Sequence, residues 1–190
     1  MVDRDPHGVQ RRVAGHHDFR MDGMRDLLWR ADGAAVFDIG CNRGAVGMDF
    51  AHHGAKLVHG CDIYAKGVET AREIFADVRS CESQFEVIDL RKGPGALKPF
   101  GDRRYDIVVM LATYHKLKRE MTPEALTELI LHFGRRTTRY FAWRATSDKP
   151  PENEQEKANL DRDLGSLGFR SVHVSYISKS LHMAAIWERS

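Results

Sequence analysis

Short apolar runs alternate with amphipathic segments along the chain from residue 34 onward. Seven of these runs have the length and composition that are typical of β-strands. Between most of them lie longer stretches in which apolar residues recur at helical spacing. The predicted strands cover residues 35–39, 57–61, 85–88, 105–111, 139–143, 171–177 and 183–187.

The longest purely apolar stretch, Ile107 to Ala112, falls largely in the fourth predicted strand. Such a strand needs cover on both faces, which is the arrangement of a parallel sheet. Strands that alternate with helices therefore predict an α/β fold: a doubly wound, mostly parallel seven-stranded sheet with helices on both faces. Only five residues separate the last two strands, too few for a crossover helix, so we expect a C-terminal antiparallel hairpin there.

Residues 1–32 are interpreted as an N-terminal extension, and residues 33–190 as the sheet-forming domain. Within the extension, apolar residues at helical spacing predict a helix over residues 19–31. In the domain, Thr122 and Pro123 supply an N-cap and a first helical residue. Gly134 is expected to end the helix that they begin.

The composition narrows the class of protein. A chain of 190 residues, 42% hydrophobic and 29% charged, suits one soluble globular domain. Its net charge of +2 gives no reason to expect that the protein as a whole binds a polyanion such as a nucleic acid. No apolar stretch is long enough to cross a bilayer. The widely spaced cysteines Cys41, Cys61 and Cys81 suit thiols of a cytoplasmic protein better than disulfides or a zinc site.

A glycine-containing turn follows the first predicted strand. Gly40 and Gly44 frame this turn and let the backbone and the amino end of the next helix face a ligand closely. Carboxylates stand at or beside the ends of the first three strands: Asp38, Asp62 and Asp89. Because the carboxyl ends of parallel strands meet at one edge of a sheet, we expect these acids to converge there.

This combination resembles the seven-stranded, Rossmann-like S-adenosylmethionine-dependent methyltransferases, and the resemblance extends from residue 34 to residue 190. In that family the first strand ends in an acid-x-Gly-x-Gly-x-Gly motif. Asp38, Gly40 and Gly44 match this motif, whereas Asn42 replaces the middle glycine. The replacement is mild, because asparagine tolerates unusual backbone angles better than most residues.

The resemblance implies that S-adenosylmethionine is the cofactor. The turn with Asp38 would hold its methionine part, Asp62 would bind its ribose, and Ile63, Asp89 and Leu90 would contact its adenine. The full set assigned to the cofactor is Asp38, Gly40, Asn42, Gly44, Asp62, Ile63, Asp89, Leu90 and Leu111. A structural alternative stays open for each acid. Asp38 could cap the turn and Asp62 could begin a loop. Asp89 could pair with Arg91.

A nicotinamide-dependent dehydrogenase is the main competing class. Its Gly-x-Gly-x-x-Gly fingerprint needs a middle glycine where this chain has Asn42. Asp38, two residues before Gly40, would also repel a diphosphate. The same acid suits a sulfonium cofactor, which carries an ammonium group and a positively charged sulfur.

The residues after the fourth strand are the candidates for handling the methyl acceptor. Segment 110–119 resembles the small-residue, aromatic and histidine pattern that follows this strand in family members acting on small molecules. His115 is the candidate general base because imidazole titrates near neutral pH. Tyr114 would orient the acceptor or pack on the sulfonium. The structural alternative for His115 is that it caps or covers the strand end.

Three further residues are expected to bind the acceptor: Lys116, Arg144 and Trp143. For Trp143, a place in the core or in the pocket wall, and not as a stacking platform, is the favoured interpretation. Segment 102–147 is locally rich in basic residues, and the functional interpretation is an anionic acceptor that carries phosphate or carboxylate. The alternative is a solvated helix and loop surface, which we favour for the run Arg135, Arg136 and Arg139. No set of histidine, cysteine and acidic residues has metal-ligand spacing, so no metal is expected.

The predicted function is therefore the methylation of a small, anionic metabolite by S-adenosylmethionine. Two alternatives stay open. The basic runs would support a nucleic-acid methyltransferase, and the same fold would also suit a non-catalytic protein that binds the cofactor. In similar enzymes an N-terminal extension lies over the cofactor cleft, so the helix predicted over residues 19–31 is a candidate lid.

Overall fold

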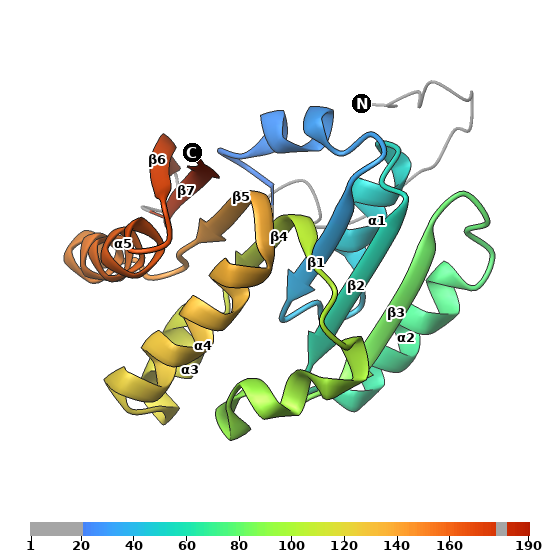
Figure 1. Cartoon of the computed structure of the whole chain (residues 1–190), viewed down its shortest axis with the longest axis horizontal. Helices are drawn as coiled ribbons and strands as arrows, with labels where there is room; N and C mark the ends of the chain where they lie inside the picture. Colours follow the sequence, from blue (N-terminus) through green and yellow to red (C-terminus); the bar gives the residue numbers. More distant parts are fainter. Residues whose placement is uncertain (1–20, 178–181) are drawn as a thin grey trace.

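The chain folds around one seven-stranded sheet (Figure 1). The computed structural model describes residues 21–177 and 182–190. All seven predicted strands are confirmed, and no strand end differs from its prediction by more than three residues. The strands are β1 (Ala35–Ile39), β2 (Leu57–Asp62), β3 (Glu82–Val87), β4 (Tyr105–Leu111), β5 (Thr137–Arg144), β6 (Phe169–Ile177) and β7 (His182–Arg189).

The strands lie in the order β3-β2-β1-β4-β5-β7-β6. Neighbouring strands from β3 to β5 are parallel, whereas β7 runs antiparallel to both β5 and β6. The predicted C-terminal hairpin is therefore confirmed. From β1 the chain continues to β2 and β3 on one side of the sheet, and the later strands then add on the other side of β1, beginning with β4. The strand order therefore reverses between β1 and β4, which is the switch point of the sheet. Doubly wound folds bind their ligands at the carboxyl end of such a switch point.

Helices cover both faces of the sheet (Figure 1). The α-helices are α1 (Ala45–His52), α2 (Ala65–Phe75), α3 (Tyr114–Glu120), α4 (Pro123–Arg136) and α5 (Pro150–Gly165). Three shorter 3₁₀ helices are η1 (Arg25–Arg30), η2 (Leu90–Lys92) and η3 (Pro94–Phe100).

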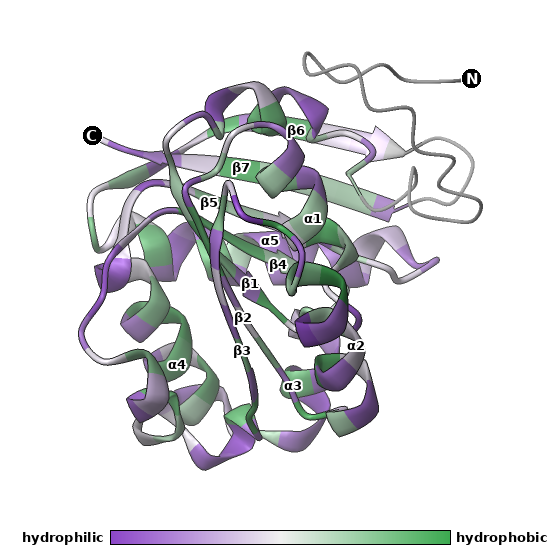
Figure 2. Ribbon diagram, turned by 90° about the vertical axis from the view of Figure 1, so that its right-hand side faces the viewer, coloured by the Kyte–Doolittle hydropathy of each residue, from purple (hydrophilic) through white to green (hydrophobic). Residues whose placement is uncertain are grey.

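Hydrophobic residues predominate in the central strand β4 (Figure 2), and its side chains belong to the cores on both faces of the sheet. In β4, Val108 and Met110 belong to the core that α3, α4 and α5 cover, whereas Ile107 and Val109 belong to the core under η1, α1 and α2. All four side chains are fully buried. This double cover explains why β4 lacks the alternation of apolar and polar residues that a half-exposed strand shows.

Gly134 does not end α4, contrary to the prediction. The helix begins as expected at Thr122, whose hydroxyl accepts a hydrogen bond from the Ala125 backbone, but it continues to Arg136. Gly134 is buried, and a Cβ added there would lie 3.2 Å from Leu164 Cδ2 of α5 and 2.6 Å from Leu167 Cδ1 just after that helix. The glycine therefore permits close packing of the two helices instead of terminating one of them.

The described part of the extension packs against a face of the sheet. Leu27 and Leu28 of η1 are buried in the core that includes α1 and α2. Arg30 donates a hydrogen bond of 2.6 Å to the Tyr140 hydroxyl, near the amino end of β5. Residues 19 and 20 of the predicted helix, and the rest of the extension before them, lie outside the described residues. In the described part, the helix is a short 3₁₀ turn over residues 25–30.

A buried histidine in β2 makes the stability of the fold depend on pH. His59 is 3% exposed, and its Nδ1 lies 2.9 Å from the Tyr105 hydroxyl. Burial, with a smaller contribution from Arg103, lowers the pKa of His59 to about 4. The unfolded chain therefore binds a proton at this residue at a higher pH than the folded chain does.

We expect the free energy of unfolding to fall as the pH is lowered from 6.5 to about 4. This one residue would contribute a loss of about 3 kcal/mol over that window. Urea unfolding at several pH values measures the effect. Acidic residues titrate in the same range, so the comparison is with His59→Gln, whose stability should fall less steeply. Parallel curves for the two proteins would contradict the prediction.

Candidate functional site

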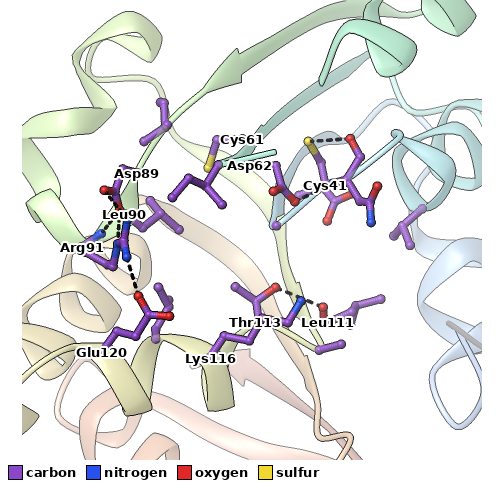
Figure 3. Close-up of a pocket in the computed structure, with 18 residues that line it drawn as sticks. Cys41, Cys61, Asp62, Asp89, Leu90, Arg91, Leu111, Thr113, Lys116 and Glu120 are labelled. Atoms are coloured by element: carbon purple, nitrogen blue, oxygen red, sulfur yellow. Dashed lines mark hydrogen bonds and ion pairs between the residues drawn. The ribbon is translucent and has the colours of Figure 1, made fainter. Parts of the chain in front are cut away.

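A cavity of about 340 Å³ lies at the carboxyl edge of the sheet, where β1, β2 and β4 end. Residues of α3 and the segment around η2 close its other sides. Of the nine residues predicted to hold a cofactor, all except Gly44 line this cavity. The three predicted acids, Asp38, Asp62 and Asp89, therefore meet at one place. Figure 3 shows how the labelled side chains lie around it.

The turn after β1 has the unusual backbone that its sequence predicts. Gly40, Asn42 and Gly44 have φ angles of 80°, 48° and 75°, all in the left-handed region. Asparagine adopts this region more readily than most residues, so Asn42 fits where the related motif has glycine. A Cβ on Gly40 would lie 2.1 Å from Oγ1 of Thr113, the N-cap residue of α3, so glycine allows Thr113 to approach the turn this closely.

Gly44 does not line the cavity but lies where the turn packs against α2. It is the N-cap of α1, and a Cβ there would lie 2.9 Å from the Ala71 Cβ of α2. Gly67, also on α2, comes equally close, since its added Cβ would lie 3.0 Å from the Asn42 carbonyl oxygen. Close packing of α2 against the turn therefore requires both glycines.

Asp62, the last residue of β2, is fixed by two backbone groups. One carboxylate oxygen accepts a hydrogen bond of 2.8 Å from the Asn42 N–H, and the other accepts one of 2.9 Å from the Tyr64 N–H. The carboxylate therefore both begins the following loop and tethers the turn after β1. Each oxygen keeps acceptor capacity for a ligand in the cavity. Ile63 follows at the rim and is 55% exposed.

Asp38 and two thiols form the buried floor of the cavity. Asp38 is 2% exposed, and Cys41 and Cys61 are equally well buried. Burial raises the pKa of both thiols, and the nearby Asp38 carboxylate raises it further. Both thiols are therefore protonated near neutral pH. The sequence predicts these cysteines as small buried residues, and it gives no sign that they line the cavity.

Asp89 pairs with Arg91, which was the structural alternative for this acid. Its carboxylate accepts hydrogen bonds from the Arg91 backbone N–H, Nε and Nη2, at 3.1, 2.7 and 2.9 Å. These bonds lower the pKa of Asp89. Arg91 Nη1 also donates to Glu120 of α3, at 2.5 Å. We call this chain of contacts the Arg91 bridge; it links η2 to α3 along one side of the cavity (Figure 3).

The end of β4 contributes two residues that the sequence analysis did not single out. Thr113 Oγ1 lies 3.2 Å from the Ile39 carbonyl oxygen and 3.1 Å from that of Leu111, so its hydroxyl links the ends of β1 and β4. Ala112 has a φ of 56°, which costs energy for a residue with a Cβ. Both residues line the cavity. No sequence signal marks the strained alanine, because alanine has no preference for this backbone region.

Helix α3 directs Lys116, Leu117 and Glu120 toward the cavity. Tyr114 differs from its prediction. Its ring is 2% exposed in the hydrophobic core, and burial raises the pKa of its hydroxyl, which interacts with Asn159 of α5. The structure therefore places Tyr114 in the packing between α3 and α5 and not in the cavity.

His115 lies beside the cavity without lining it. Its Nδ1 is 3.3 Å from the Thr146 hydroxyl, in the segment after β5. Burial lowers the pKa of His115, and Lys116 and Arg119 lower it further. The imidazole is therefore neutral near pH 7 and able to accept a proton.

The two other residues predicted to bind an acceptor are both buried. Trp143 is 0% exposed, and its ring packs in the core against Trp187 of β7. Arg144 ends β5 and is 9% exposed. One of its guanidinium nitrogens lies 3.4 Å from His182 Nδ1 at the start of β7. Neither residue lines the cavity, but the Arg144 guanidinium belongs to the same edge of the sheet.

The described segments of the chain are residues 21–177 and 182–190. There, histidine, cysteine and acidic side chains do not gather in any group of three or more that could hold a metal. No helix in those segments combines the length and the apolar character needed to cross a membrane.

Known proteins provide an independent comparison. The family model of a methyltransferase domain matches residues 36–132, just over half of the chain. No curated protein sequence matches. Among solved structures, the magnesium protoporphyrin IX methyltransferase of Synechocystis, solved with bound S-adenosylmethionine, is 20% identical. It aligns with a TM-score of 0.65 over 92% of this chain and 80% of that one.

Two further solved structures have the same architecture. A S-adenosylmethionine-dependent methyltransferase of Clostridium acetobutylicum is 7% identical, with a TM-score of 0.68 over 93% of each chain. The ribosomal protein L11 methylase of Lactobacillus delbrueckii is 14% identical, with a TM-score of 0.59 over 87% of this chain and 76% of that one. The TM-scores show a shared fold, and at such low sequence identities they show no more than the fold. The substrates named for these proteins also differ.

Proposed function

This chain belongs to the methyltransferase domain family, and on that basis we propose that it methylates a small, anionic metabolite. It is a S-adenosylmethionine-dependent enzyme. The observation that carries the proposal is the meeting of Asp38, Asp62 and the Gly40 turn in one cavity at the switch point of the sheet. A cationic sulfur and an ammonium group suit such acids, whereas a diphosphate does not.

The residues present fit this cofactor. The turn at Gly40 has no room for a side chain, since an added Cβ would lie 2.1 Å from Thr113 Oγ1. Asp62 would accept hydrogen bonds from the ribose hydroxyls, and the apolar walls at Ile63 and Leu90 would enclose the adenine. When bound, S-adenosylmethionine supplies a methyl group that is already activated by its sulfonium.

The remaining task of the protein is to align an acceptor and to remove its proton where it has one. His115 is the proposed base or acceptor-orienting group. With Nδ1 near Thr146, Nε2 is the ring nitrogen left for the acceptor. Arg144 would attract an anionic group to the same edge of the sheet. The thiols of the chain are unpaired, which supports a cytoplasmic location.

The basic runs give weak support to a nucleic-acid substrate. Lys116, Lys118 and Arg119 belong to α3, which follows the carboxyl end of β4. Arg135 and Arg136, in contrast, precede the amino end of β5, at the opposite edge of the sheet. The two runs therefore do not form one continuous surface for a phosphate backbone.

A comparison of two ligands tests the proposed function. We expect S-adenosylhomocysteine to raise the melting temperature of the protein clearly and NAD to leave it unchanged, because a ligand that binds the folded state stabilises it by an amount that grows with the ratio of its concentration to its dissociation constant. Differential scanning fluorimetry measures both shifts. Stabilisation by NAD alone would instead favour a nicotinamide-dependent dehydrogenase over a methyltransferase. Binding of S-adenosylhomocysteine without turnover on any small acid would favour a non-catalytic cofactor-binding protein.

A further inference from the structure

We infer that the Lys116 ammonium binds the carboxylate of the methionine part of S-adenosylmethionine. This assignment rests on the proposed function and goes beyond it, because it moves Lys116 from the acceptor to the donor. Three observations support it: the place of Lys116 in the cavity, the charges around it, and the chemistry of the donor.

Lys116 lies at the end of the cavity that the glycine turn forms. Its backbone N–H donates to the Thr113 carbonyl at 3.0 Å, so the two residues are one helical turn apart. Thr113 in turn stands directly over Gly40. Figure 3 shows the Lys116 side chain beside Thr113, whereas the Arg91 bridge lies at the other end of α3. Lys116 thus faces the region assigned to the methionine part.

Of the basic side chains that line the cavity, Lys116 is the one that can pair with an anionic group of a ligand. Arg91 is the other basic residue that lines the cavity, and Asp89 and Glu120 already engage it. Glu120 lies one helical turn after Lys116, but its carboxylate pairs with Arg91 and not with Lys116. Among the described residues Lys116 has no ion-pair partner. Lys118, on the same helix, instead lies 3.9 Å from Glu156 of α5.

The donor offers two opposite charges to this part of the cavity. Its methionine part carries an ammonium and a carboxylate on the same carbon atom. Asp38 supplies a buried negative charge on the floor of the cavity, and Lys116 supplies a positive charge from its wall. A zwitterion is bound best where both of its charges meet an opposite one. An acceptor anion, in contrast, would need Lys116 to stay unpaired while the donor is bound.

Isothermal titration calorimetry with two ligands separates these roles. S-Adenosylhomocysteine carries the carboxylate, and its decarboxylated analogue S-adenosylthiopropylamine differs by the loss of that group alone. We expect Lys116→Met to weaken binding of the first by about 10-fold and to leave the second unchanged. Lys118→Met is the matched control and should alter neither affinity. Lys116→Arg keeps the charge and should retain most of the affinity for S-adenosylhomocysteine.

The possible results are distinct. The inference is overturned if Lys116→Met changes both affinities equally or changes neither. If the unmodified protein binds S-adenosylhomocysteine but not more tightly than its decarboxylated analogue, the inference also fails while the proposed function stands. If the unmodified protein binds neither ligand, the proposed function fails as well.

Discussion

Replacing Asp62 with alanine is expected to weaken the binding of S-adenosylhomocysteine by about 100-fold. The substitution removes the proposed acceptor for the ribose hydroxyls. It also removes the two hydrogen bonds, of 2.8 and 2.9 Å, that hold the turn after β1 and the start of the next loop. Both losses act on the same part of the cavity. Isothermal titration calorimetry gives the dissociation constant directly.

Two further variants show whether the effect belongs to this carboxylate. Asp62→Asn keeps one acceptor oxygen, so its loss should be smaller, about 10-fold. Asp89→Ala should cost less than either, because the Asp89 carboxylate already accepts three hydrogen bonds from Arg91. A folded Asp62→Ala protein with unchanged affinity would remove Asp62 from the cofactor site.

Replacing His115 with alanine is expected to reduce turnover by about 100-fold and to leave the affinity for S-adenosylhomocysteine unchanged. The residue lies beside the cavity without lining it, so its loss should not disturb the cofactor. A methyl-transfer assay with small carboxylic and phosphorylated acceptors measures turnover, once one acceptor is found. The matched control is His132→Ala on α4, a partly buried histidine that is remote from the cavity.

The pH profile gives this prediction a second readout. Burial, Lys116 and Arg119 lower the pKa of His115 below its ordinary value of 6.5, so the neutral base is present at pH 7 and above. Turnover should fall as the imidazole gains a proton, and the midpoint of this acidic decline should lie below pH 6.5. A His115→Ala enzyme that keeps both its rate and this acidic decline would exclude His115 from the mechanism.

The sequence predicts the sheet well because burial acts on it directly. Strands such as β4 are covered on both faces and are nearly free of polar residues, so they can be recognised without knowledge of their neighbours. The place of β7 between β5 and β6 depends on pairing with distant strands, and no local pattern specifies it. The role of Gly134 likewise depends on distant residues, because the glycine packs against Leu164 and Leu167 and does not end its own helix.

The candidate site was predictable where it follows from topology. Acids at the ends of parallel strands must meet at one edge, and Asp38 and Asp62 do so. The rotation of α3 about its axis was not predictable, because the helix has only seven residues and little apolar periodicity. Tyr114 consequently faces the core, whereas Lys116 and Glu120 face the cavity. The Arg91 bridge needed a contact between η2 and α3 that no local pattern specifies.

The reversed strand near the end of the chain has a consequence for the order of folding during synthesis. On the growing polypeptide, β6 leaves the ribosome before β7, yet among the described residues β7 is the only strand that pairs with β6. The edge of β5 stays uncapped for the same period. The emergence of residues 182–189 from the ribosome therefore lets β7 pair with both strands, and until then β5 and β6 each expose a strand edge that could pair with another chain.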